Sequence, residues 1–161
     1  MPTPKRRRFE IRQRQKRRQK ISSGIIFKRR LKELLSRIKI KRGTRPIHVL
    51  FVCFHGIAAS GLMQEGLKML LEKFDMQHYF DIARGRCTFS DVFHLKSVDY
   101  IVFLPKNVTK DTVKMQLTRV DPNSKAKIVE FPLLPNTGIL DEINYKNLVI
   151  KLLEKELQGS N

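Results

Sequence analysis

Apolar residues form strand-like runs and helical stripes mainly after residue 46. Residues 47–53 are apolar at nearly every position, which is typical of a strand covered on both faces. Shorter strand patterns follow at residues 78–83, 99–104 and 127–131. Apolar positions at helical spacing predict helices over residues 58–74, 90–95, 109–117 and 140–157. Strands and helices therefore alternate along this part of the chain.

This alternation predicts an α/β fold, a small four-stranded parallel sheet with helices on both faces. The inward side of the first helix is predicted to carry Leu62, Leu67, Leu70, Leu71 and Phe74. The inward side of the last is predicted to carry Ile143, Leu148, Val149, Leu152 and Leu153. Ligands of such sheets bind at the carboxyl ends of the strands, here at the loop that follows Cys53.

The first 46 residues differ from the rest in charge. They hold 19 Lys and Arg against two acidic residues, a net charge of +17, whereas residues 47–161 carry a net charge of +1. Gly43 and Pro46 mark a boundary between the two parts. The sequence thus predicts a basic N-terminal arm, 1–46, and an α/β domain, 47–161, that folds without it.

The arm itself has two parts. Residues 5–20 contain ten positive charges and only two apolar side chains, Phe9 and Ile11, which predicts a segment that is disordered when free. Ser22 and Ser23 are suited to cap a short amphipathic helix after them. The apolar stripe of this helix consists of Phe27, Leu31, Leu34, Leu35 and Ile38. The α/β domain, a protein partner and an anionic membrane are the three surfaces on which such a stripe is expected to dock.

A charge density of this kind favours a polyanionic partner. Lys and Arg placed on phosphates release condensed counterions, and arginine-rich segments commonly fold on RNA. We therefore expect nucleic acid, RNA over DNA, with a ribosome or another ribonucleoprotein as the context. A nuclear or mitochondrial targeting segment, a membrane-surface helix and a solubilising tail are the alternatives. The candidate nucleic-acid-binding residues are Lys5, Arg6, Arg7, Arg8, Arg12, Arg14, Lys16, Arg17, Arg18, Lys20, Lys28, Arg29 and Arg30.

The remaining composition sets broad limits. Two cysteines, Cys53 and Cys87, do not indicate a secreted disulfide framework, which favours the cytoplasm or another intracellular compartment. No apolar stretch reaches the roughly 20 residues that span a bilayer. The histidines lack metal-ligand spacing, so neither a metal nor a cofactor is predicted. The oligomeric state is left open.

The loop after the first strand carries a motif. The run from Val49 to Ser60, VLFVCFHGIAAS, resembles the signature of low-molecular-weight protein tyrosine phosphatases: a strand, a Cys, five residues, an Arg, then Ser or Thr opening a helix. The resemblance implies a nucleophile at Cys53 and a supporting hydroxyl at Ser60. It also implies an anion-binding loop of Phe54, His55, Gly56, Ile57, Ala58, Ala59 and Ser60.

Two positions depart from that family. Ala59 stands where the phosphate-binding arginine is expected, and Phe131-Pro132 stands in place of the Asp-Pro pair that carries the general acid. Loss of a charge clamp and of an acid each removes orders of magnitude in rate. The pattern of Cys53, Gly56 and Ser60 also resembles the B components of cellobiose-class sugar phosphotransferases, whose cysteine accepts phosphate without a loop arginine.

The sequence therefore predicts a non-catalytic, RNA-associated protein built on a degenerate phosphatase-like scaffold. The alternative is a divergent cysteine-dependent phosphatase or phosphoryl carrier that uses Cys53. A third interpretation makes Cys53 a small buried hydrophobe at the end of a strand. Arg84, Gly85 and Arg86 are expected in an ordinary solvated turn, or else in a basic loop that adds to the RNA footprint. Cys87 beside them is a candidate redox partner of Cys53.

Overall fold

The computed structural model describes residues 3–55 and 58–158, and all side chains of these ranges except those of residues 15–23. In chain order the elements are α1 (Pro4–Arg42), β1 (Ile47–Cys53), α2 (Ala59–Lys73), η1 (Gln77–Tyr79), β2 (Phe80–Arg86), η2 (Leu95–Ser97), β3 (Tyr100–Phe103), α3 (Lys110–Val120), β4 (Lys127–Glu130) and α4 (Glu142–Gln158).

The four strands form one sheet in the order β2-β1-β3-β4, and every pair is parallel. The predicted α/β fold with a four-stranded parallel sheet is confirmed. β1 lies in the middle of the sheet and is buried along almost its whole length, which explains its unbroken apolar run.

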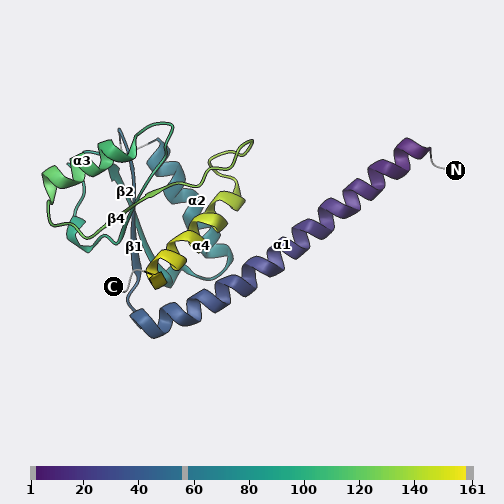
Figure 1. Cartoon of the computed structure of the whole chain (residues 1–161), viewed down its shortest axis with the longest axis horizontal. Coiled ribbons are helices and arrows are strands. Elements are labelled where there is room, and N and C mark those ends of the chain that lie inside the picture. The colour runs from purple at the N-terminus through teal and green to yellow at the C-terminus, as the bar shows by residue number, and fades with distance from the viewer. Residues whose placement is uncertain (1–2, 56–57, 159–161) are drawn as a thin grey trace.

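Helices cover both faces of the sheet. In Figure 1, α2 and α4 lie on one side and α3 on the other. The core under α2 and α4 contains Phe51 and Val102, and the core under α3 contains Leu50 and Ile101. Successive residues of a strand thus point into opposite cores, as the pleat requires.

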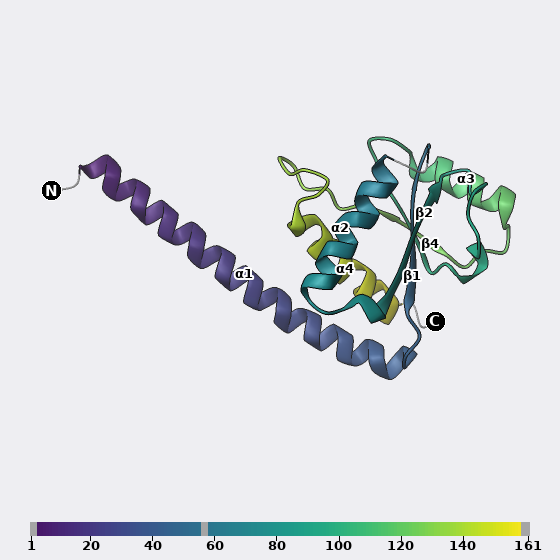
Figure 2. The same ribbon diagram turned by 180° about the vertical axis from the view of Figure 1, so that it is seen from behind.

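α1 is one continuous helix, and this differs from the predicted disorder of residues 5–20. The Thr3 side chain accepts a hydrogen bond from the Arg6 amide, with Pro4 in the first turn, and Gly43 ends the helix at φ 64°. Figures 1 and 2 show its N-terminal half projecting away from the body of the molecule. Arg, Lys and Gln are good helix formers, so a helix nucleated in the docked half can extend through this segment.

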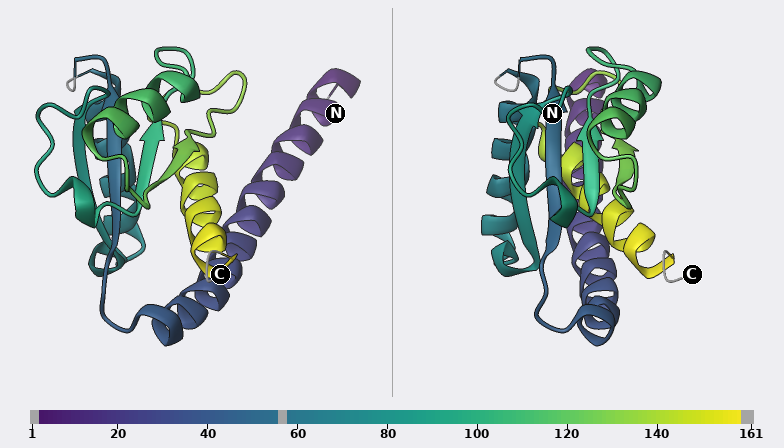
Figure 3. Two further views of the ribbon diagram at one scale, coloured as in Figure 1. Left: turned by 60° about the vertical axis from the view of Figure 1, so that its left-hand side comes forward. Right: turned by 90° about the vertical axis from the view of Figure 1, so that its left-hand side faces the viewer.

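The C-terminal half of α1 belongs to the core, so the predicted separation of an arm from an independently folded domain does not describe it. Phe27, Leu31, Leu34 and Ile38 are buried in the same cluster as α4, with Leu35 packed at its edge. Figure 3 shows this half lying along α4 and the other half diverging from it. The apolar stripe was predicted correctly, and through it α1 packs against the outer side of α4.

Three local predictions were wrong. β2 runs on through Arg84 and Arg86, because β1 pairs with it as far as Cys53, so these arginines do not form a loop. Residues 90–94 form no helix, since Phe89 and His94 both adopt left-handed backbone angles, and the short η2 begins only at Leu95.

The third wrong prediction concerns which residues of α2 and α4 face the core. Leu62 is 42% exposed and Ile143 38% exposed. Met63 and Tyr145 are the buried residues instead.

An ionic cluster fastens the end of α1 to the body. Arg42, with a side chain only 9% exposed, donates to Glu156 of α4 at 2.7 Å and to Asp99 at 3.2 Å. The Tyr100 hydroxyl donates to Glu156 at 2.7 Å. Burial alone would raise the pKa of Glu156, but the hydrogen bonds from Tyr100 and Arg42 and the charges of Arg42 and Lys41 lower it below its usual value.

We expect Glu156→Gln to cost about 1–3 kcal/mol of unfolding free energy at neutral pH, because it weakens charge-assisted hydrogen bonds to Arg42 and Tyr100. A carboxyl whose pKa is lowered on folding contributes stability above its unfolded pKa, about 4.3, and loses it as the pH falls through the folded pKa. Urea unfolding should therefore show the two proteins converging below about pH 4. Glu33→Gln, which removes the partner of an exposed pair, is the control and should change little. A pH-independent difference would contradict this account of Glu156.

Candidate functional site

The N-terminal end of α1, residues 4–14, is called here the basic tip. Its cations are Lys5, Arg6, Arg7, Arg8, Arg12 and Arg14, and all are exposed. Among the described side chains, the tip has one ion pair, Arg6 with Glu10 at 3.7 Å. Lys16, Arg17, Arg18 and Lys20 lie in the same helix, but their side chains are outside the described residues. The tip therefore presents dense, largely uncompensated positive charge to solvent.

This charge also opposes the helix that carries it. The first turn of α1 has no acidic residue, and cations there lie at the positive end of the helix dipole. Like charges three and four residues apart destabilise the helix further. A bound polyanion would relieve both effects.

The three candidate cations further along α1 have different surroundings. Arg29 is exposed. Arg30 donates to Glu33 and to Glu154 of α4, each at 3.1 Å, so it links α1 to the body. Lys28 is exposed and lines a groove between α1 and the body. Of the three, Arg30 is thus the cation whose charge is already compensated by carboxylates of the chain.

The loop after Cys53 lies where the strand order reverses. The chain leaves β1 for β2 on one side of it and later returns to β3 on the other, which is the place at which open parallel sheets bind ligands. A cavity of about 390 Å³ opens there, lined by Cys53, Phe54, His55, Ala58, Ala59 and Asn107. Gly56 and Ile57, two members of the predicted anion-binding loop, are outside the described residues.

Cys53 and Ser60 are brought together as the motif predicts. The buried Cys53 thiol donates a hydrogen bond to Ser60 Oγ at 3.1 Å, and Ser60 is fully buried. The Ala58 side chain makes no capping hydrogen bond to the start of α2. A thiol and a hydroxyl thus lie together at the start of α2, and Cys53 lines the adjacent cavity.

The groups that phosphoryl transfer needs in addition are missing from the described lining. Ala59, at the position of the family's arginine, is buried and cannot place a charge there. Phe131, at the position of the acid, is 2% exposed and packs its ring against Tyr145 at 5.2 Å. The described lining residues contain neither a cation nor a carboxylate.

One charge near the loop was missed by sequence reasoning. Arg84 extends from β2 over the first turn of α2, where a Cβ on Gly61 would lie 2.7 Å from Arg84 Nη1. The glycine is therefore what lets the guanidinium approach the start of the helix. Asn107, which follows β3, was missed as well. Arg84 lies near the carboxyl end of β2, and Asn107 comes after the end of β3. Closeness to the carboxyl end of a parallel strand was the available signal for both.

Cys87 is not placed as a redox partner. Its amide donates to the Cys53 carbonyl at 2.8 Å, but its side chain belongs to the core under α3, whereas Cys53 belongs to the core under α2. Burial raises the pKa of the Cys87 thiol, its backbone hydrogen bond lowers it in part, and the neighbouring Cys53 raises it. Cys87 therefore stays protonated, and it is a poor nucleophile.

Two further kinds of site are absent from the described residues. No set of three or more His, Cys, Asp or Glu side chains in the described part of the chain is arranged to hold a metal ion. No helix of the described residues combines the length and apolar character needed to cross a bilayer.

No protein-family model matches the chain, and no curated protein matches it. The resemblance to the low-molecular-weight phosphatases therefore stays a prediction that rests on the loop motif.

We expect no hydrolysis of a generic aryl phosphate above the buffer background, because the missing acid and the missing clamp each cost about 10²–10⁴-fold. Wild type and Cys53→Ser should be indistinguishable in a continuous phenol-release assay. Hydrolysis that disappears in Cys53→Ser would contradict this and would show that another residue supplies the charge, with Arg84 the first to test.

Proposed function

We propose that this protein binds RNA through the basic tip of α1 and that its α/β body is a non-catalytic scaffold. The observation that carries the proposal is the projection of an exposed, densely cationic helix from a body that is nearly neutral. The cations of the tip have almost no carboxylate partners among the described side chains. Phosphates are the ligands that such a surface recognises.

Arginine is the commoner cation of the tip, and its chemistry favours RNA. A guanidinium binds phosphate through two parallel hydrogen bonds and stacks on exposed bases, which RNA loops and bulges supply. A helix at the end of a long projection reaches between closely packed phosphates that the body could not approach. A ribosome or another ribonucleoprotein inside the cell is the context that we propose.

A cysteine-dependent phosphatase or phosphoryl carrier is the second candidate. The contact between Cys53 and Ser60 at the strand switch point favours it. The neutral lining of the adjacent cavity, as far as the described residues form it, supports the scaffold instead. The aryl phosphate assay separates the two.

The proposal is tested by fluorescence anisotropy with labelled hairpins of one sequence, made as RNA and as DNA. The full chain should bind the RNA hairpin at least several-fold more tightly than the DNA hairpin at about 150 mM salt, with stacking on the RNA loop as the source of the difference. Equal affinities for the RNA and DNA hairpins would show that the helix recognises phosphate charge density and does not distinguish RNA from DNA. The absence of binding at low salt would overturn the proposal.

A further inference from the structure

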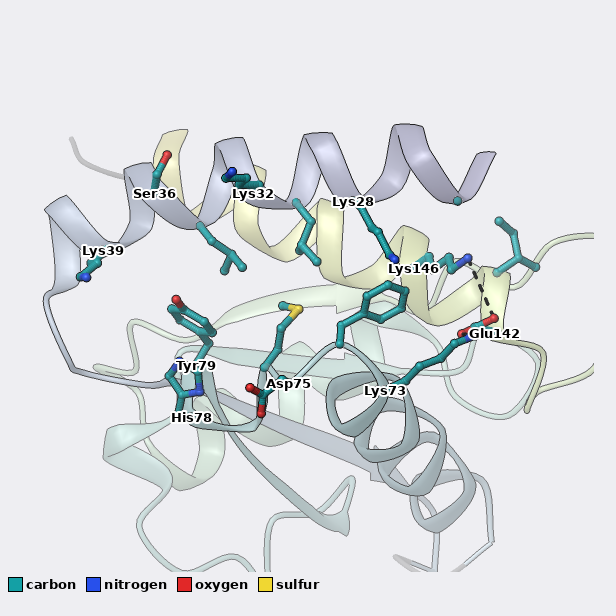
Figure 4. Close-up of a pocket in the computed structure, with 16 residues that line it drawn as sticks. Lys28, Lys32, Ser36, Lys39, Lys73, Asp75, His78, Tyr79, Glu142 and Lys146 are labelled. Atoms are coloured by element: carbon teal, nitrogen blue, oxygen red, sulfur yellow. Dashed lines mark hydrogen bonds and ion pairs between the residues drawn. The ribbon is translucent and has the colours of Figure 1, made fainter. Parts of the chain in front are cut away.

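A second surface of α1 faces the body and is not filled by it. A groove of about 1270 Å³ runs between the C-terminal half of α1 and the segment that joins α2 to β2, with the start of α4 behind it. Figure 4 shows Lys28, Lys32, Ser36 and Lys39 along the α1 side, and Lys73, Asp75, His78 and Tyr79 across from them.

The groove is long and shaped for an elongated ligand. Its α1 wall extends from Gly24 to Lys39, which at 1.5 Å per residue is about 22 Å, or four helical turns. Its volume is above the range of roughly 300–1,000 Å³ that is usual for small-molecule pockets. One side is open to solvent, so a ligand that is apolar on every side would stay partly in water.

The floor is apolar and the rims are cationic. The apolar lining comes from Leu31 and Leu35 of α1, from Phe74, Met76 and Tyr79 of the segment after α2, and from Ile143 of α4. Five lysines line the groove against two carboxylates, Asp75 and Glu142. An apolar floor between charged rims is the pattern that receives an amphipathic helix.

The charge of the two rims is not balanced equally. Lys73 and Lys146 are paired with Glu142 at 2.8 and 3.9 Å. Lys28, Lys32 and Lys39 on the α1 rim have no ion pair among the described side chains. The uncompensated charge is therefore on one wall and in one row, where acidic side chains of a ligand would meet it.

We propose that this groove binds an acidic amphipathic helix of a partner protein, about four turns long. Its apolar stripe would lie on Leu35, Phe74 and Tyr79, and its Asp and Glu residues would pair with Lys28, Lys32 and Lys39. A second copy of the chain fits less well, since each copy carries a net charge of +18. A single acyl chain would leave much of this open volume unfilled. α1 would thus join two partners, RNA at its tip and protein at its base.

The test uses three labelled peptides of 18 residues and the full chain. The first has Leu at positions i, i+3, i+4 and i+7 with Glu on the flanks, the second has Lys in place of Glu, and the third is a scramble of the first. The acidic amphipathic peptide should bind at least tenfold more tightly than the scramble, and the Lys peptide should not bind. Equal binding of the first and third would overturn the proposal, because charge alone would then be sufficient.

Matched variants separate the groove from the basic tip. Lys28→Glu with Lys32→Glu should weaken the acidic peptide at least tenfold and create binding of the Lys peptide. Arg6→Glu with Arg8→Glu changes the net charge equally and should shift the affinity less than threefold. All four side chains are exposed, so the fold should be kept. Equal losses in the two variants would overturn the proposal.

Further measurements test the apolar floor of the groove and two other possible occupants, a membrane and a second copy of the chain. Ile143→Ser should weaken the acidic peptide several-fold, whereas Met115→Ser on the exposed side of α3 should not. Two further results would overturn the assignment: binding to phosphatidylglycerol vesicles that depends on Lys28 and Lys32 while no peptide binds, and self-association in sedimentation that the Lys28→Glu, Lys32→Glu variant abolishes.

Discussion

Replacing Arg6, Arg7, Arg8 and Arg12 with glutamine is expected to weaken RNA binding about 10²–10³-fold at physiological salt. Each phosphate contact contributes about 0.7–0.9 to the slope of log affinity against log salt, so the loss of four contacts should lower the slope by about 3. Glutamine keeps the helix-forming propensity of these positions. The measurement is anisotropy with a hairpin RNA at several salt concentrations between about 50 and 300 mM.

The control removes four charges from the body. Lys106, Lys110, Lys114 and Arg119 are exposed on or next to α3, far in sequence from the tip, and can be replaced with glutamine together. This variant should retain RNA affinity within a few-fold and show a nearly unchanged salt slope. If both variants lost affinity equally, binding would follow net charge, and the tip would have no special part in it.

Leu34→Ala should destabilise the protein by about 2–5 kcal/mol, the range for a large side chain removed from a packed core. Leu34, on α1, is 1% exposed and belongs to the hydrophobic cluster that α1 shares with α4. A change of this size is a large fraction of the 5–15 kcal/mol that stabilises a typical domain. Urea unfolding followed by circular dichroism at 222 nm gives the difference directly.

The matched control is on the same helix. Ile40 is 88% exposed, and Ile40→Ala should change the free energy of unfolding by less than about 0.5 kcal/mol. Deletion of residues 1–46 should be worse than Leu34→Ala, since it removes Phe27, Leu31, Leu34 and Ile38 together. A stable, monomeric 47–161 fragment would show that the docking of α1 contributes little to the fold.

The sheet could be predicted from the sequence because its central strand is buried on both faces. Residues 47–53 are apolar in almost every position, and the following segments alternate between strand and helix patterns. The apolar stripe from Phe27 to Ile38 could also be predicted, because burial of one side of a helix requires apolar residues three or four positions apart.

The conformation of the basic tip could not be predicted in this way. Its composition alone indicates disorder, whereas in the structure it continues the helix whose other half is packed in the core through Leu31 and Leu34. The groove was equally hidden. It arises from the distance between α1 and residues 73–79, which is a property of packing that no local pattern encodes.

In the loop, the contact between Cys53 and Ser60 followed from the motif, but the placement of Arg84 did not. Arg84 belongs to a different strand, and its approach depends on the register of β2 against β1 and on the absence of a side chain at Gly61. Sequence reasoning located the site and missed the residues that reach it from neighbouring strands.

Because α1 is continuous, both the distance of the basic tip from the body and the rotation of its side chains about the helix axis are fixed. No turn separates the basic tip from the residues docked on α4, so the position of the body sets both how far the tip extends and which way each of its arginines points. From Pro4 to Phe27 the helix covers about 35 Å at 1.5 Å per residue. One residue inserted there would lengthen this span by only about 1.5 Å but turn every tip side chain by about 100°. The length of this segment therefore sets the direction of the tip's charges, as its composition sets their number.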